Sequence, residues 1–211
     1  MFCRLHTCLL FIALCFAPLC AAAQDNEEKL QRGDIVFIAL RTHAGWYICK
    51  TTGSPVSHVG IIDRNAAGEL TVIHAGITVE EIKLDAFMKY GNGRLAAVRF
   101  PFADASQRET FILTARSFIG VAYDMKYRID NEEIYCSELI YRSFLDGLAL
   151  TPTPLKAMDY KAAGEKVWQF WVRFFKGDVP HGELGIGPGA ILADPDFHTV
   201  INEFVQDNAT P

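Results

Sequence analysis

Three residues of this chain have the types and spacing of a thiol-based hydrolase, and the first is Cys136. It begins a segment whose apolar residues recur close to the i, i+3, i+4 spacing of a helix, at Leu139, Ile140, Phe144 and Leu148. A thiol at a helix N-terminus lies near free backbone N–H groups and the positive end of the helix dipole, which stabilise a thiolate. We therefore expect Cys136 to be a nucleophile. A small buried hydrophobe is the structural alternative.

The other two residues are histidines on neighbouring predicted strands. His58 and His74 flank a turn at residues 65–68. If the hairpin pairs residues whose numbers sum to 132, His58 faces His74 directly and both imidazoles project from one face of the sheet. One ring can then take a proton from Cys136 while the other orients it, and Gly60 leaves room for a helix N-terminus. A shift of one residue would separate the two rings.

The histidine pair could instead be half of a metal site. A structural zinc site needs at least one more ligand. The remaining candidates have no paired spacing: His43, His181 and His198. We expect neither a metal nor a cofactor.

Residues 1–23 have the features of a secretory signal peptide. Arg4 precedes the apolar run 9–14, and three alanines follow at 21–23. The run is too short to span a bilayer. We expect a mature domain at 24–211, located in a bacterial periplasm or secreted, without stable membrane insertion.

Cysteine usage gives no disulfide framework. Four of the six cysteines lie in the predicted leader, which leaves Cys49 and Cys136. A bridge between these two is the alternative to a free thiol at Cys136. Lipid anchoring at Cys15 or Cys20 fits less well, because leucine precedes each of them.

Charge and composition exclude some partners. The formal charge is −5, and removal of Arg4 with the leader makes it −6. No basic cluster interleaved with aromatics is present, so nucleic acid is not an expected partner.

The periodicity along the chain predicts an α+β fold with a largely sequential antiparallel sheet. Predicted strands are 35–40, 58–63, 70–75, 78–82 and 95–100, and predicted helices are 84–90, 105–118, 136–147 and 165–175. Asp104 is the expected N-cap of the second of these helices. Residues 41–50 fit a short helix or a loop. We expect the aromatic stripe of the last helix to be core, and the apolar tail at 185–195 to fold back onto the domain.

The chain resembles a known family through a series of short motifs in order. They are Gly33-Asp34-Ile35-Val36-Phe37, Ser57-His58-Val59-Gly60, Val72-Ile73-His74-Ala75, Ile119-Gly120-Val121-Ala122-Tyr123-Asp124, Tyr135-Cys136-Ser137-Glu138-Leu139-Ile140 and the segment Pro188 to Pro195. Together they are similar to the YiiX/YaeF-type permuted papain-like amidases, relatives of the NlpC-type cell-wall peptidases. The resemblance implies a circularly permuted papain-like fold, in which an antiparallel sheet packs against helices.

The resemblance also implies roles for the three residues. Cys136 is the nucleophile, His58 the general base, and His74 takes the orienting position, where the closest members usually have Glu. A thioester would form on Cys136 and water would hydrolyse it. The expected substrate is a small peptide, a peptidoglycan fragment or a lipid-like amide, and Tyr123 and Tyr135 either line its cleft or simply pack at the rim.

Two other functions stay open. The Val-Ile-His motif and the aromatic segment 167–175 suggest a lipid-directed acyl hydrolase or acyltransferase with the same triad. A catalytically inactive binding module that retains the fold is the third possibility. Glu138, in the first turn after Cys136, is expected to cap the helix.

Overall fold

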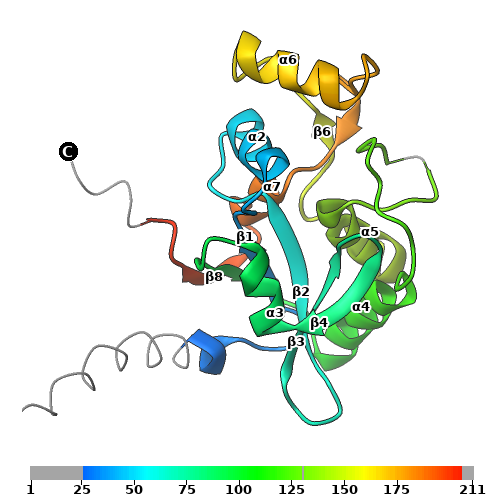
Figure 1. The fold of residues 1–211 in the computed structure, drawn as a ribbon. Coiled ribbons are helices and arrows are strands. Elements are labelled where there is room, and N and C mark those ends of the chain that lie inside the picture. The colour runs from blue at the N-terminus through cyan, green and yellow to red at the C-terminus, as the bar shows by residue number, and fades with distance from the viewer. Residues whose placement is uncertain (1–25, 130, 206–211) are drawn as a thin grey trace, which may run out of the picture.

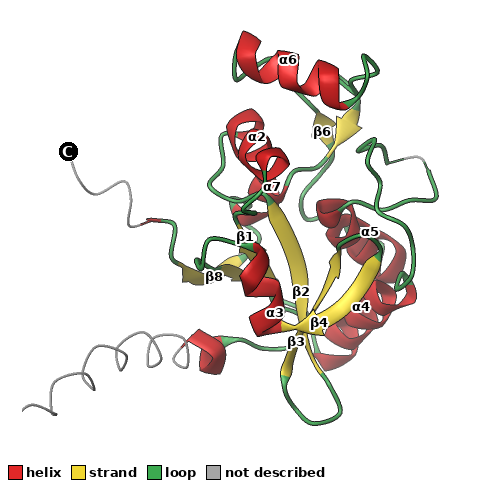
Figure 2. Ribbon diagram, viewed as in Figure 1, coloured by secondary structure: helices red, strands yellow, loops and turns green. Residues whose placement is uncertain are grey.

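The computed structural model describes residues 26–129 and 131–205. The predicted signal peptide, 1–23, lies outside the described residues. Figure 1 shows the described chain as a sheet with helices on both sides, and Figure 2 shows the same view by secondary structure. No helix in the described ranges is long and apolar enough to cross a membrane.

A six-stranded antiparallel sheet forms the centre of the fold, in the order β4-β3-β2-β1-β5-β8. Its strands are β1 (Ile35–Ile38), β2 (His58–Arg64), β3 (Leu70–Ala75), β4 (Val79–Lys83), β5 (Ala96–Arg99) and β8 (His198–Asn202). The first five match the predicted strands. β8 was not predicted, because only pairing with β5 reveals a strand in the segment that follows the apolar tail.

Helices pack against both faces of this sheet. The helices α4 (Ala105–Ser117), α5 (Cys136–Leu148) and α7 (Pro188–Leu192) contact one side, and α3 (Leu84–Tyr90) contacts β3 and β4 on the other. Each side has its own buried apolar cluster, one around Phe111 and Phe144 and the other around Phe87. The expected N-cap is present: the Gln107 N–H donates to Asp104 Oδ1 over 2.8 Å.

Two further helices pack together beyond the end of the sheet. The segment 41–50, which fits a helix or a loop by sequence, is mostly helical: α2 spans His43–Thr52, and Thr42 caps it by accepting a hydrogen bond from the Gly45 N–H over 3.0 Å. Aromatic side chains join α2 to α6 (Glu165–Phe174), and a short sheet of β6 (Lys156–Ala157) and β7 (Leu184–Gly185) lies close by. The aromatic stripe is core, as expected: Val167 and Trp171 are buried in a third cluster.

The register of the β2–β3 hairpin differs from the predicted one by two residues. His74 pairs with Gly60 and Leu70 with Arg64, so paired numbers sum to 134. The loop after Arg64 is two residues longer than expected, 65–69 instead of 65–67, because Asn65 Oδ1 accepts hydrogen bonds from the N–H groups of both Ala67 and Glu69. Direct opposition of His58 and His74 was therefore wrong. An even shift keeps every side chain on its face, so both imidazoles still share one side.

Candidate active site

Cys136 is the first residue of α5 and is almost fully buried. Two hydrogen bonds fix the start of this helix. The Tyr135 N–H donates to Glu138 Oε2 over 3.2 Å, which confirms the capping role of Glu138. The Ser137 hydroxyl donates to the carbonyl of Ile186 over 2.8 Å, which ties the helix to the segment after β7.

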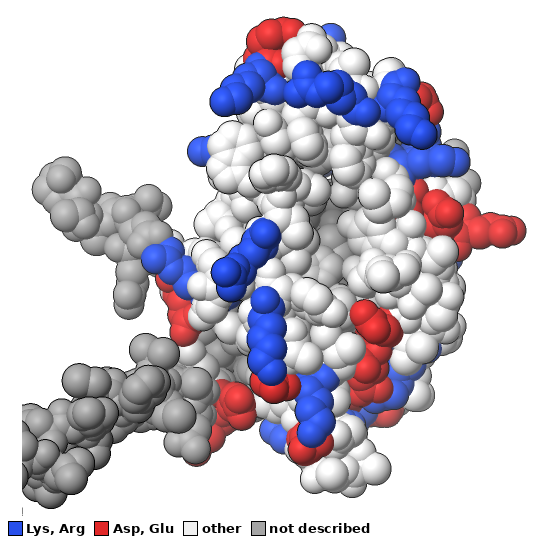
Figure 3. All heavy atoms as spheres, viewed as in Figure 1, with Lys and Arg blue, Asp and Glu red and all other residues white. Residues whose placement is uncertain are grey.

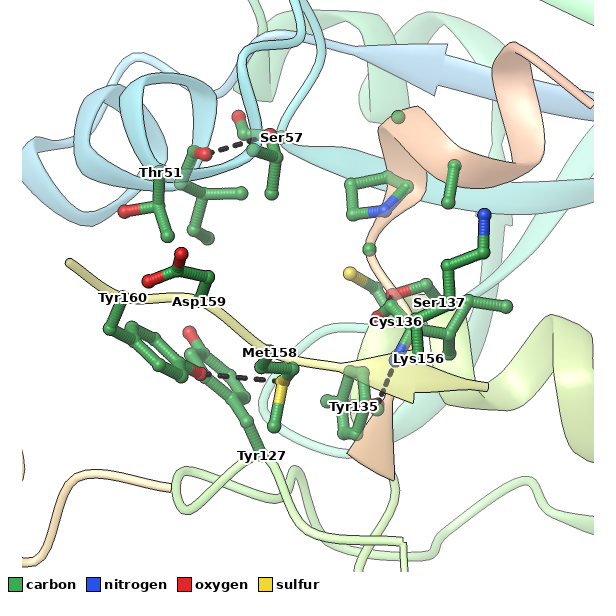
Figure 4. A pocket seen from close by; sticks show the side chains of 18 of the residues that line it. Thr51, Ser57, Tyr127, Tyr135, Cys136, Ser137, Lys156, Met158, Asp159 and Tyr160 are labelled. Carbon is green, nitrogen blue, oxygen red and sulfur yellow. Dashed lines mark hydrogen bonds between the residues drawn. The ribbon is translucent and has the colours of Figure 1, made fainter. Parts of the chain in front are cut away.

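A cavity of about 340 Å³ opens beside Cys136. Figure 4 shows the sulfur of Cys136 pointing into it, opposite Thr51, Asp159 and Tyr160. The walls come from α2, the start of α5, the β6–β7 region, α6 and α7, and are mostly apolar. Their largest side chains are Tyr123, Tyr127, Tyr135, Met158, Tyr160 and Trp171.

The two histidines form a hydrogen-bonded pair. Nε2 of His58 lies 3.0 Å from Nδ1 of His74, and both rings pack against Phe87 of α3. Burial lowers the pKa of His58 to about 3, with help from the neighbouring His74, and lowers the pKa of His74 to about 4. Both imidazoles are therefore neutral at pH 7.

The thiol of Cys136 is also neutral at rest. Burial raises its pKa to about 11, and the backbone N–H groups of Ser137 and Val59 offset only part of this effect. The helix N-terminus was expected to stabilise the thiolate, but desolvation of the buried thiol outweighs that effect. Cys49 and Cys136 are both free cysteines.

Cys136 lies beside the strand that carries His58. Val59, whose N–H faces the thiol, follows His58 in β2, and Ser57, just before it, lines the cavity. Neither histidine lines that cavity, and among residues 26–129 and 131–205 no hydrogen bond joins Cys136 to His58. The structure thus brings His58 and His74 together, and the contact of His58 with the thiol stays a prediction.

Gly60 makes room for β3 rather than for a helix end. A Cβ atom at Gly60 would lie 2.4 Å from Val72 Cγ1 and 3.1 Å from His74 Cβ. The expectation that this glycine admits the N-terminus of a helix was therefore wrong. Because Gly60 has no side chain, His74 and Val72 of β3 can occupy that face of the hairpin.

Both tyrosines singled out in the sequence line the cavity. The Tyr123 hydroxyl lies near Tyr127 and Cys136, and the phenol pKa of Tyr123 is raised well above its usual value by burial. The Tyr135 hydroxyl accepts a hydrogen bond from the Ile186 N–H over 3.1 Å. Tyr123 is thus the one of the two whose hydroxyl approaches the thiol.

Sequence reasoning missed Glu80 and part of the cavity wall. Glu80 Oε1 lies 3.5 Å from Nε2 of His74, and Glu80 is the cross-strand partner of His74. Extending the β3 pairing through the tight turn at 76–78 would have found it. Tyr127, Tyr160 and Trp171 come from segments with no regular spacing relative to Cys136, so no local pattern indicates them.

Charged groups are sparse around the cavity. Figure 3 shows Lys and Arg side chains gathered over α6 and a mostly uncharged surface below it. In the parts of the chain that the structure describes, no group of three or more His, Cys, Asp and Glu side chains could hold a metal ion.

Known proteins are similar to this chain over most of its length. The protein named "Uncharacterized protein YiiX" of Escherichia coli K12 is 24% identical over 178 residues, which cover 82% of this chain and 87% of that protein. A crystal structure described as metalloprotein yiiX from Escherichia coli O157:H7 matches with a TM-score of 0.76 and 22% identity, over 83% of this chain and 98% of that one. The described residues of the present chain offer no three-ligand site for such a metal.

The family comparison agrees with the architecture. Residues 29–201 match the family described as "Permuted papain-like amidase enzyme, YaeF/YiiX, C92 family". The antiparallel sheet with helices on both faces, and the order of the histidine strands before the cysteine helix, confirm the expected permuted papain-like fold. This chain belongs to the YaeF/YiiX family of permuted papain-like amidases.

Proposed function

We propose that this protein is a secreted cysteine hydrolase that cleaves an amide bond through a thioester on Cys136. The observation that carries the proposal is a thiol at a helix N-terminus, open to a cavity and beside β2, whose first residue, His58, is hydrogen-bonded to His74 in β3. His58 acts as the general base and His74 orients it. The predicted leader supports export to the periplasm or the exterior.

The chemistry starts from neutral groups. Substrate binding in the cavity brings a carbonyl carbon to Sγ, and the thiol proton passes to His58 as the carbon–sulfur bond forms. Catalytic hydrogen bonds are often long in a free enzyme and tighten when the substrate is bound, so an unformed thiol–imidazole bond at rest is compatible with this step. The backbone N–H of Cys136 and the hydroxyl of Tyr123 are the donors we assign to the oxyanion.

Breakdown of the tetrahedral intermediate expels the amine, which takes the proton from His58. Water then attacks the thioester with His58 again as base, which releases the acid and restores the thiol. We assign Tyr123 and Tyr135 to substrate contact, because both line the cavity next to Cys136. The amine leaving group can belong to a peptide, a peptidoglycan stem peptide or a lipid-like amide.

The apolar lining favours a second candidate within the same chemistry. A cavity of about 340 Å³ walled mainly by aromatic and aliphatic side chains suits an apolar acyl group better than a charged peptide. A lipid-directed acyl hydrolase or acyltransferase would use the same three residues. Parallel assays on stem peptides, N-acyl amides and the matching esters distinguish the two candidates. Turnover of esters alone would contradict the amidase proposal.

Substitution of the nucleophile tests the proposal. We expect Cys136→Ala and His58→Ala each to lower turnover of the best amide by at least about a thousandfold, because the nucleophile and its base act as a unit. Cys49→Ala is the matched control and should keep full activity, because its thiol does not line the cavity. Thermal melting checks that each variant is folded. Activity retained in folded Cys136→Ala protein contradicts the proposal and favours a binding module.

A further inference from the structure

Nε2 of His74, in the histidine pair, is a buried ring nitrogen without a hydrogen-bond partner among the described residues. Nδ1 of His74 faces His58, whereas Nε2 of His74 is buried and makes no hydrogen bond in the described parts of the chain. Oε1 of Glu80 lies 3.5 Å from this nitrogen, slightly beyond hydrogen-bond distance. A buried imidazole N–H is costly unless it donates to an acceptor, so this nitrogen calls for one.

The sheet is built to bring Glu80 to this place. Glu80 in β4 is directly opposite His74 in β3, so the two side chains share a face. Gly76, in the turn between the strands, leaves the space for the carboxylate. A Cβ atom there would lie 2.6 Å from Glu80 Oε1 and 3.2 Å from His74 Cε1.

The histidine pair has two possible proton arrangements, and only one of them supports a base. If His58 carries its proton on Nε2, it donates to Nδ1 of His74, and its own Nδ1 is free to accept the thiol proton. His74 must then carry its proton on Nε2. If His74 instead carries its proton on Nδ1, the direction reverses, His58 is protonated on Nδ1, and that nitrogen cannot act as a base.

We propose that Glu80 is a positioning residue that selects the productive arrangement. Its carboxylate accepts the Nε2–H of His74, which leaves Nδ1 of His74 as an acceptor and therefore directs His58 to act as base through Nδ1. During acylation the proton of Cys136 stops on His58, and Glu80 takes none. The proposal rests on the roles given to Cys136 and His58 in the proposed function. It adds a fourth residue, from a third consecutive strand, to the three proposed above.

Nitrogen-15 NMR of the imidazoles tests this without any need for turnover. In protein labelled at histidine, we expect His58 and His74 both to be protonated on Nε2. Glu80→Ala should produce a mixture or the reversed arrangement. Gly76→Ala should do the same while retaining the carboxylate, because its new methyl group pushes Oε1, the end of a flexible side chain, away from His74.

Kinetics give the second readout, with p-nitrophenyl butyrate as the probe ester and with the best amide. We expect Glu80→Ala to lower kcat about tenfold to a hundredfold with KM within about twofold, as for other residues that orient a catalytic group. Glu80→Asp should recover part of the loss. Glu69→Gln is the control of equal charge change, because Glu69 lies at an exposed turn, where it accepts hydrogen bonds from Asn65 and Lys83.

The outcomes separate this proposal from the proposed function. An unchanged proton arrangement in folded Glu80→Ala protein overturns the role of Glu80, even if Cys136→Ala is inactive. If Glu80→Ala changes the proton arrangement but the wild-type protein hydrolyses neither probe, the role of Glu80 in the histidine pair is supported and the proposed hydrolase function is overturned. Equal losses in Glu69→Gln and Glu80→Ala, without a change in the NMR signals, also count against Glu80.

Discussion

At Cys136, two effects of opposite sign act on one thiol, and burial is the stronger. The start of α5 and the N–H of Val59 favour the thiolate, whereas removal from water disfavours it and raises the pKa to about 11. His58, with a pKa lowered to about 3, is neutral as well. The resting site therefore holds no thiolate–imidazolium ion pair, and charge develops only when an acyl group is bound.

Alkylation of the thiol measures this charge state. In a Cys49→Ala background, we expect the rate of reaction of Cys136 with iodoacetamide to rise with pH through the alkaline range, because only the thiolate reacts and its pKa is about 11. His58→Ala should leave this profile almost unchanged. A plateau that extends below pH 7 would show an ion pair at rest and contradict the expectation. Mass spectrometry of the labelled peptide follows the reaction.

The sequence could identify these residues but not their ionisation. A cysteine or histidine within a short motif of helical or strand pattern can be recognised in the sequence, as Cys136, His58 and His74 were. The sign of a pKa shift depends on how deeply the group is buried. That burial comes from the packing of segments distant in sequence, such as α3 against the histidines. The sequence did not identify Glu80 for a related reason: its position opposite His74 depends on the β3–β4 register.

At the level of elements, the first turn of α5 contains a carboxyl group that charges at a high pH. Glu138 is fully buried, its Oε1 has no hydrogen-bond partner among the described residues, and burial raises its pKa to about 8, with a smaller effect of Asp124. Below pH 4.5 the group is protonated in both the folded and unfolded chain. Between pH 4.5 and about 8 only the folded chain keeps the proton, so this group's contribution to stability falls as pH rises.

Glu138→Gln removes this dependence. We expect the variant to unfold at nearly the wild-type denaturant concentration near pH 4.5 and to be more stable above pH 8, by a few kcal/mol, since each pKa unit corresponds to about 1.4 kcal/mol. The amide oxygen can still accept from the Tyr135 N–H. Urea unfolding at several pH values makes the measurement, and Glu132→Gln, at an exposed position in the loop before α5, is the control. A constant difference between wild type and Glu138→Gln at all pH values would show that Glu138 is not protonated in the fold.

The β2–β3 hairpin shows which part of an element can be predicted. The pattern along 58–63 and 70–75 correctly gave two strands with His58 and His74 on one face. Their exact pairing depended on the length of the loop between them. Asn65 sets that length, because its side chain accepts hydrogen bonds from the N–H groups of Ala67 and Glu69. The error of two residues changed the partner of His74 but not the side of the sheet.

At the scale of the whole molecule, α6 is joined to α2 through side-chain packing. Trp171 is buried, and its Nε1–H donates to Thr51 Oγ1 in α2 over 2.6 Å, while Tyr47 and Phe170 stack between the same helices with ring centroids 3.6 Å apart. Trp171 also forms part of the cavity wall. This packing unit therefore links the stability of α6 to the shape of the site.

Hydrogen exchange tests that link. We expect Trp171→Ala to raise amide exchange strongly in α6 and α2 and to leave α5 and β2 protected, because a buried Trp→Ala change removes about 3–5 kcal/mol of packing from one local unit. Trp168→Ala, on the same helix but partly exposed, is the control and should have a small effect. Equal loss of protection in β2 would mean that the molecule opens as one cooperative unit.

The sequence indicated the sheet and its helices but not the cavity. Periodicity predicts an element from its own residues, so the sequence could predict β1 to β5 and α3 to α6. The strands β6, β7 and β8 are short or mixed in pattern, and partners far along the chain define them. The cavity is the space left between α2, the start of α5, the β6–β7 region, α6 and α7, so no single segment of the sequence indicates it.

The order of the strands has a consequence for how the chain is completed during synthesis. β1, the first strand, lies inside the sheet between β2 and β5, and β8 covers the outer edge of β5. The meander from β1 to β4 can form as soon as it emerges, and β5 can then pair with β1, but the outer edge of β5 stays unpaired until the last strand is made. A chain that ends before His198 would expose the free edge of β5, and such an edge is a template for aggregation. We expect nonsense or trimming events in this region to yield insoluble protein rather than a weakened enzyme.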